Sequence, residues 1–133
     1  MSTHNIYLLD TCICIALLKK KPNVVQHLRE VGINNCKISD ITLAELYFGA
    51  FKSGKNNHFY DVSEISKLFE HYPIQYTRKY GEIRWSLEKQ GLRIGDMDMF
   101  IAATALEEGA TLVTGNVKHF ERIQGLKIEN WMD

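Results

Sequence analysis

The chain has 133 residues, the length of one domain that buries about two-thirds of its unfolded surface. Hydrophobic residues make up 45% of it and aromatic residues 11%, which favours a packed core and excludes an intrinsically disordered chain. Its 16 Lys and Arg residues balance 16 Asp and Glu residues, so the overall charge indicates neither a nucleic-acid partner nor an acidic tail.

Strands and helices alternate along the chain. The expected helix boundaries are marked by lysines at the end of the first helix, by Pro22 at the start of the second, and by Gly32, Gly54 and Gly91 at later ends. In chain order we expect a strand at residues 5–10, helices at 11–20 and 22–32, a strand at 36–40, helices at 41–54 and 59–72, a strand at 73–76, helices at 77–91 and 92–105, and strands at 111–116 and 126–131.

This alternation predicts one α/β domain over residues 1–133, a three-layer α/β/α sandwich with a mostly parallel central sheet. In such sheets, ligands bind outside the carboxyl ends of the strands. Four polar residues are expected at that rim, from the ends of strands or the starts of helices: Asp10, Glu45, Asp98 and Asn116.

The segment LRIGDMDMFIAATA, residues 92–105, carries two aspartates on an otherwise apolar helix. On a helical wheel Asp98 falls on the apolar side with Ile101 and Ala105, whereas Asp96 points nearly opposite, as a first-turn carboxylate that answers the helix dipole. A lone carboxylate removed from water costs several kcal/mol unless a cation or hydrogen-bond donors compensate. Oxygen donors without His or thiolate match Mg²⁺ or Mn²⁺ and phosphate-ester chemistry, so the pattern predicts a metal site.

Each candidate also has an ordinary structural explanation. Asp10 suits a helix N-cap, because it follows a strand and precedes a helix. Glu45 on its own is typical of a solvated glutamate, and Asn116 of a turn residue. For Asp98 the alternative is burial beside a nearby arginine such as Arg93. The prediction of a metal site therefore depends on all four residues being expected at the same rim of the sheet.

Four segments occur in the order and spacing of PIN-domain ribonucleases: LLDTCI, ITLAELYFGA, IGDMDMFIAATAL and LVTGNVKHFERIQGL. The match spans nearly the whole chain and resembles the VapC toxins of bacterial type II toxin-antitoxin pairs. Position by position, the resemblance places the acidic metal-binding set on Asp10, Glu45 and Asp98. It places Asn116 at the fourth position, with Thr114 as its supporting hydroxyl.

The resemblance implies a Mg²⁺-dependent endoribonuclease toxin, with Mn²⁺ as the alternative ion, that cuts structured RNA such as transfer RNA and inhibits translation and growth. In that scheme Asp10, Glu45 and Asp98 hold one or two ions, which activate a water and neutralise charge on the leaving oxygen, while Asn116 positions a water or ligand. The resemblance further implies a homodimer and a cognate VapB-like antitoxin that inserts an arginine into the acidic site.

Cys12 stands where the family's LDTN or LDTS has a small polar side chain beside the first aspartate. This departure leaves open a second interpretation, a catalytically silent PIN-like module that binds protein or RNA. Two other enzyme classes fit less well. A haloacid-dehalogenase phosphotransferase requires D-x-D, and Cys12 occupies the second position. A cysteine phosphatase requires Cys-x₅-Arg, and Lys20 stands at that distance from Cys14.

The sequence signals for contacts with RNA and with partners are less specific. Near Asn116, His119 suits a proton donor, although a surface histidine in a turn is the commoner case. The stretch HFYDVSEISKLF offers apolar residues at helical spacing for a groove or a dimer contact, and core packing accounts for it equally well. The cations considered for the RNA path are Lys19, Lys20, Lys21, Lys52, Lys55, Arg93 and Lys118.

Cysteine usage and hydropathy bear on the compartment. The chain has three cysteines, an odd number that suits the reduced thiols of a cytosolic protein. No apolar run approaches the length of a bilayer span. We therefore expect a cytoplasmic protein that does not contact a membrane.

Overall fold

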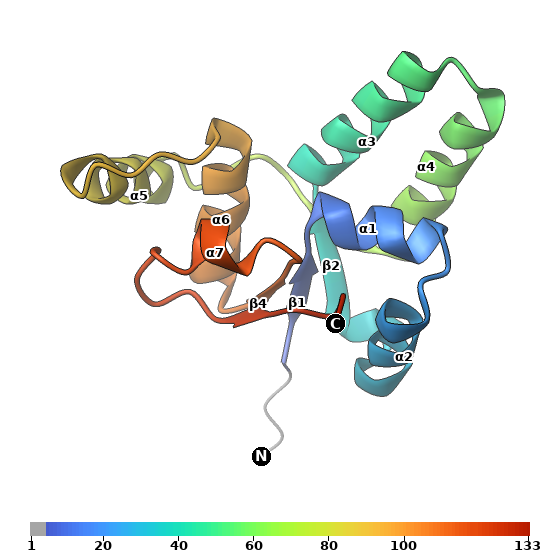
Figure 1. Ribbon diagram of the computed structural model, residues 1–133, viewed down its shortest axis with the longest axis horizontal. Helices are drawn as coiled ribbons and strands as arrows, with labels where there is room; N and C mark the ends of the chain where they lie inside the picture. The colour runs from blue at the N-terminus through green and yellow to red at the C-terminus, as the bar shows by residue number, and fades with distance from the viewer. Residues whose placement is uncertain (1–4) are drawn as a thin grey trace.

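A five-stranded sheet lies between helices in the computed structural model, which describes residues 5–133 (Figure 1). The strand order is β3-β2-β1-β4-β5, and every pair of neighbouring strands is parallel. The prediction of an α/β sandwich with a largely parallel sheet is confirmed. The strands are β1 (Tyr7–Leu9), β2 (Cys36–Ser39), β3 (Glu70–Tyr72), β4 (Thr111–Val113) and β5 (Ile128–Glu129).

Helices make the crossovers between these strands. Gly54 ends the helix Asp40–Ser53 with φ 67°, a left-handed conformation that glycine adopts without strain. No helix among residues 5–133 has both the length and the apolar character needed to cross a membrane. The helices are α1 (Thr11–Leu18), α2 (Pro22–Val31), the short 3₁₀ helix η1 (Ile33–Asn35), α3 (Asp40–Ser53), α4 (Asn56–Leu68), α5 (Thr77–Lys89), α6 (Asp96–Glu108) and α7 (Val117–Phe120).

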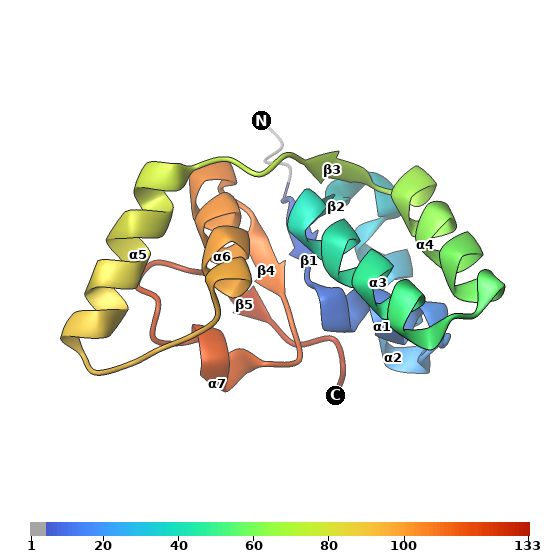
Figure 2. The same ribbon diagram turned by 90° about the horizontal axis from the view of Figure 1, so that it is seen from above.

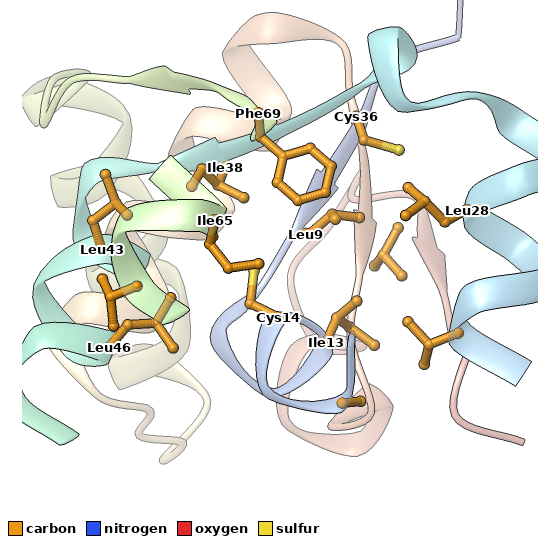
Figure 3. Close-up of a cluster of buried hydrophobic side chains, with 14 of the residues drawn as sticks. Leu9, Ile13, Cys14, Leu28, Cys36, Ile38, Leu43, Leu46, Ile65 and Phe69 are labelled. Atoms are coloured by element: carbon orange, nitrogen blue, oxygen red, sulfur yellow. The ribbon is translucent and has the colours of Figure 1, made fainter. Parts of the chain in front are cut away.

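The sheet separates two hydrophobic clusters, because successive residues of a strand point to opposite faces. Leu8 packs in one cluster with residues of α5 and α6, and its neighbour Leu9 packs in the other with residues of α1 to α4. Figure 2 shows these two groups of helices on either side of β1, and Figure 3 shows the second cluster, to which Leu9, Ile13 and Ile38 all belong. Both faces of the sheet are therefore covered, which leaves the carboxyl ends of β1 and β4 as its polar rim.

Strand β3 lies at residues 70–72 and not at the predicted 73–76. Pro73 has no N–H to donate to a ladder, and Tyr76 has φ 65°, which is incompatible with an extended strand. The true strand, Glu70–Tyr72, is largely exposed at the edge of the sheet, so it carries no run of apolar residues. The sequence signal for a buried strand was absent because the strand is not buried.

Helix α4 begins earlier and ends earlier than the predicted 59–72, because the chain turns into β3 after Leu68. Within the stretch HFYDVSEISKLF, Val62 and Ile65 are buried in the core, whereas Tyr60 and Leu68 are exposed. Core packing thus accounts for the apolar stripe, and only the flanking side chains remain for a surface contact. The short helix α7 lies in a region for which the sequence predicted only a turn.

Candidate active site

Asp10 lies at the carboxyl end of β1 and is the N-cap of α1. Its Oδ1 accepts a hydrogen bond from the Ile13 N–H at 3.1 Å and one from the Cys12 thiol at 2.9 Å. The residue is only 6% exposed. The N-cap explanation is therefore correct, and it places a carboxylate inside the rim of the sheet.

The electrostatic surroundings of Asp10 are unfavourable for a bare carboxylate. Burial raises the pKa of Asp10, hydrogen bonds from Cys12, Thr114 and the Ile13 N–H oppose the rise, and the negative charge of Asp98 adds to it. The contribution of Asp98 is the smallest of these, and it comes from a residue 88 positions later in the sequence. A buried carboxylate that has neutral hydrogen-bond donors and a second negative charge in its surroundings favours a nearby cation.

Asp98 lies in the first turn of α6 and contacts a histidine of α7. His119 Nε2 is 2.8 Å from Asp98 Oδ2, and the two side chains are 36% and 33% exposed. The helical-wheel prediction that Asp96 points away from the apolar side is confirmed. Its side chain is 69% exposed, and its Oδ1 accepts a hydrogen bond from the Tyr80 hydroxyl on α5. The alternative of burial beside Arg93 is wrong, since the partner of Asp98 is His119.

Glu45 lies on α3, and its Oε1 accepts a hydrogen bond of 2.6 Å from the Thr11 hydroxyl. Since Thr11 directly follows Asp10, this bond holds the start of α3 against the start of α1. Ser39 positions α3 by accepting the Ile41 N–H at 3.0 Å. Glu45 is thus not a freely solvated glutamate; it lies at the rim, at one side of a groove of about 300 Å³ between α1, α3 and α4.

Asn116 follows β4 and lies at the start of α7. Its N–H donates to the Oγ1 of Thr114 at 3.0 Å, and Thr114 is completely buried. The Asn116 side chain is exposed and borders an open hollow of about 540 Å³ with Lys118 and His119. The rim therefore lies between two depressions, one reached by Glu45 and one by Asn116 and His119.

Comparison with known proteins places the chain in a family. The model of the PIN domain matches residues 7–126. Over 131 residues the chain is 43% identical to ribonuclease VapC2 of Rickettsia felis, with 95% of this chain and 98% of that protein covered. The chain belongs to the VapC family of PIN-domain proteins. It is also 38% identical to the tRNA(fMet)-specific endonuclease VapC of Salmonella typhimurium, over 94% of this chain and 97% of that protein.

Solved structures of VapC proteins share the fold. In the crystal structure of VapBC2 from Rickettsia felis bound to a promoter DNA fragment, a chain 40% identical to this one superposes with a TM-score of 0.88, covering 95% of this chain and 98% of that one. A chain of the DNA-bound VapBC from Salmonella typhimurium gives the same TM-score at 32% identity, with 96% and 98% covered. The parallel sheet and its rim are therefore those of a VapC fold.

Cys12, the departure from the VapC pattern, makes polar contacts of its own. Besides donating to Asp10, its sulfur accepts the Gly115 N–H at 3.3 Å and so joins the start of α1 to the loop after β4. A Cβ at position 115 would lie 3.2 Å from the Met132 side chain and 3.6 Å from the Cys12 sulfur, so a side chain there would require Met132 to shift slightly. The Cys12 thiol therefore gives Asp10 a hydrogen bond in place of the small polar side chain that the family has at this position.

The donor set bears on the kind of ion the site can hold. Within residues 5–133, no three His, Cys, Asp or Glu side chains are close enough to form a metal cage by themselves. Asp10 and Asp98 offer two hard oxygen ligands. Mg²⁺ is typically held in this way, by one or two carboxylates, with water and substrate phosphate completing its shell. The residues therefore fit Mg²⁺ better than an ion that needs a preformed protein cage.

Sequence reasoning missed two members of this arrangement. It assigned His119 to the surface of a turn, although the imidazole contacts Asp98. It regarded Cys12 as a loss, although the thiol bonds both Asp10 and Gly115. The only signal for His119 was its position three residues after Asn116, one turn along the helix that α7 forms.

Proposed function

We propose that this VapC-family chain is a metal-dependent endoribonuclease whose catalytic residues are Asp10, Glu45, Asp98 and Asn116. The observation that carries the proposal is the placement of three carboxylates at one edge of the sheet: Asp10 caps α1, Glu45 accepts a hydrogen bond from the adjacent Thr11 hydroxyl, and Asp98 lies in the first turn of α6. Ionised Asp10 is buried among neutral hydrogen-bond donors and is costly there unless a cation binds beside it. The identity to VapC ribonucleases supports RNA as the substrate.

Asp10 and Asp98 would hold Mg²⁺, with Mn²⁺ as the alternative, and Glu45 would complete the set through water. When bound, the ion supplies positive charge that activates a water and stabilises the charge developing on the phosphate. Glu45, oriented by the Thr11 hydroxyl, accepts a proton from the attacking water. The amide of Asn116 donates to a phosphate oxygen without adding negative charge, and His119 fixes the orientation of Asp98.

We infer a toxin that acts in the cytoplasm on structured RNA and thereby inhibits translation and growth. The substrate class with support is transfer RNA, because a relative 38% identical to this chain is named a tRNA(fMet)-specific endonuclease. Transfer RNA also offers single-stranded loops in which a backbone phosphate is accessible. Which transfer RNA and which bond are cut depends on contacts outside the acidic rim.

A VapB-like antitoxin is the proposed partner, since the solved relatives are VapBC complexes. The groove between α1, α3 and α4 suits a helical or extended antitoxin segment. Ile15, Leu46 and Val62 give it apolar walls, and Glu45 places a carboxylate at the groove. An arginine of the antitoxin would pair with this carboxylate. For the homodimer, the exposed aromatic side chains of α3, Phe48 and Phe51, offer an apolar contact surface.

The decisive experiment is RNA cleavage by the purified chain with a matched pair of variants. We expect transfer RNA to be cut in Mg²⁺, the cut to be lost in EDTA, and added Mg²⁺ to restore it. Asp98→Asn should lower the rate by at least about 100-fold, because a charge at the reacting centre is lost. Asp96→Asn, a change two positions away on the exposed side of the same helix turn, should leave the rate within about twofold.

Two results would contradict the nuclease proposal. Equal cleavage by wild type and Asp98→Asn would trace the activity to a contaminant. Binding of transfer RNA without cleavage, in Mg²⁺ or Mn²⁺, would instead support the silent PIN-like binding module.

A further inference from the structure

An exposed tryptophan lies on the outer face of α5, away from the acidic rim. Trp85 is 63% exposed, whereas Trp131, the other tryptophan of the chain, is completely buried. The ammonium of Lys89, one helical turn later, lies 5.8 Å from the centre of the Trp85 ring. Tryptophan is among the residues that contribute most to binding when they become buried by a ligand.

Trp85 and Lys89 border a groove of about 300 Å³ between α5 and the segment that follows α7. Arg122 lies on the facing side. Four charged residues line the groove, but Lys79 is already paired with Glu82 at 2.9 Å and with Glu107 at 3.7 Å. The cations that remain for a ligand are Lys89 and Arg122. The sequence had placed neither of them on an RNA path.

The surroundings of Trp85 favour a nucleic acid over a protein. Protein interfaces present contiguous apolar patches, such as Phe48 and Phe51 on α3. Trp85 instead stands alone, because the other exposed residues of α5 are polar, charged or glycine. A single aromatic ring among cations matches single-stranded RNA, in which a base stacks on the ring and the flanking phosphates contact the cations.

The groove is within reach of a strand held at the acidic rim. Leu106 lines the groove and lies on the same helix as Asp98, about 12 Å further along its axis at roughly 1.5 Å per residue. This distance corresponds to about three or four stacked nucleotides at roughly 3.4 Å each. Figure 2 shows α5 alongside α6, with α7 near both. Along the axis of α6, Asp98 and the groove-lining Leu106 are therefore separated by the length of a few nucleotides.

We propose that Trp85 stacks an unpaired base of the RNA that the acidic site cleaves, with Lys89 and Arg122 against the neighbouring phosphates. This inference rests on the proposed function and deepens it. It defines the substrate as RNA with a single-stranded segment a few nucleotides from the cleaved bond. The groove on α5 is then a substrate site separate from the metal-binding carboxylates.

The two tryptophans allow a direct optical test. Asp98→Asn protein, in which we expect cleavage to be at least about 100-fold slower, is titrated with single-stranded oligoadenylate RNA and, separately, with the same strand in a duplex. Since Trp131 is buried, quenching of tryptophan fluorescence reports on Trp85. We expect strong quenching by the single strand and little by the duplex, whose bases are already stacked.

Variants of the same protein separate stacking from charge. Trp85→Ala should weaken binding of the single strand, measured by a fluorescent label on the RNA, about tenfold, and Trp85→Phe should weaken it less. Arg122→Gln should weaken binding of single-stranded and duplex RNA alike and reduce the salt dependence. Thermal unfolding of each variant should match the parent, because both residues are exposed.

Three outcomes would overturn the inference: equal quenching by duplex RNA, unchanged affinity of Trp85→Ala, or a fluorescence change that follows protein concentration without RNA. The last would identify the α5 face as an interface between copies of the chain. Failure of this inference is distinguishable from failure of the proposed function. If wild type cleaves transfer RNA but Trp85 does not respond, only the stacking site is wrong. If Trp85 responds but nothing is cleaved, the site belongs to a silent RNA-binding module.

Discussion

His119 and Asp98 are in direct contact, with Nε2 of the imidazole 2.8 Å from Oδ2 of the carboxylate. They come from α7 and from the first turn of α6, so the contact fixes the loop after β4 against the helix that precedes it. The imidazole therefore sets where the Asp98 carboxylate lies. His119 is therefore a positioning residue for the proposed metal site.

Removing the imidazole should weaken metal binding. We expect His119→Ala to bind Mn²⁺ about 10- to 100-fold less tightly than wild type, the usual loss when a residue that orients a metal ligand is removed. Calorimetric titration of the RNA-free protein measures this directly, with Lys118→Ala as the control on the same helix. Tighter binding by His119→Ala would show that the imidazole competes with the ion for Asp98.

Asp10 combines a structural and a proposed catalytic role, and one substitution separates them. Asp10→Asn keeps an oxygen acceptor for the Ile13 N–H, and asparagine caps helices as well as aspartate does. It removes a charge whose burial raises the pKa of the aspartate. We expect the metal-free variant to melt at a higher temperature than wild type at neutral pH, while RNA cleavage is lost.

The advantage of Asp10→Asn should depend on pH in a defined direction. A carboxyl whose pKa is raised in the folded protein destabilises the fold when it is ionised, and protonation removes this cost. The gain in melting temperature should therefore be present at neutral pH and shrink as the pH falls through the raised pKa. A difference that grows on acidification would contradict the burial argument.

The outline of this site could be predicted from the sequence because it depends on element ends. In a parallel sheet, the residue after a strand and the first turn of the helix that leads into a neighbouring strand lie at the same edge, and this is where Asp10 and Asp98 are found. His119 could not be placed, since its contact depends on how α7 turns back toward α6. Strand β3 was misplaced for a related reason: it is an edge strand whose pairing, not its hydrophobicity, defines it.

The thiol of Cys12 should react slowly although the residue is only partly buried. Burial, together with the hydrogen bond to Asp10 and its charge, raises the pKa of Cys12 from its ordinary 9.0 to about 11. The thiolate is the reactive form, so alkylation near pH 8 should be roughly 100-fold slower than for a free thiol. Mass spectrometry of iodoacetamide-treated protein measures the rate at this residue.

Two comparisons identify the cause of the slow reaction at Cys12. In denaturant, the thiol should alkylate at the ordinary rate, since burial and the contact with Asp10 are both lost. In folded Asp10→Asn protein it should alkylate faster than in wild type, because the neighbouring negative charge is gone. A rate unchanged between folded and unfolded protein would show that Cys12 is not held in the site.

The groove beside Glu45 offers a test of the proposed antitoxin contact at Gly49. This glycine lies on α3 and lines the groove, and a Cβ added there meets no atom within 4 Å. Gly49→Leu should therefore place an apolar side chain at the groove and, because leucine favours a helix over glycine, stabilise the fold by about 0.5 to 1 kcal/mol. We expect it to weaken the complex with the VapB-like antitoxin at least tenfold.

Gly49→Ala is the matched control, because alanine gives the same gain in helix stability and leaves the groove open. Its affinity for the antitoxin, measured by surface plasmon resonance, should stay within about twofold of wild type. Transfer RNA cleavage without antitoxin should be retained by both variants, so that Gly49→Leu becomes a nuclease that its antitoxin no longer restrains. Equal antitoxin affinity for Gly49→Leu and Gly49→Ala would place the antitoxin on another surface, of which the exposed Phe48 and Phe51 are the next to examine.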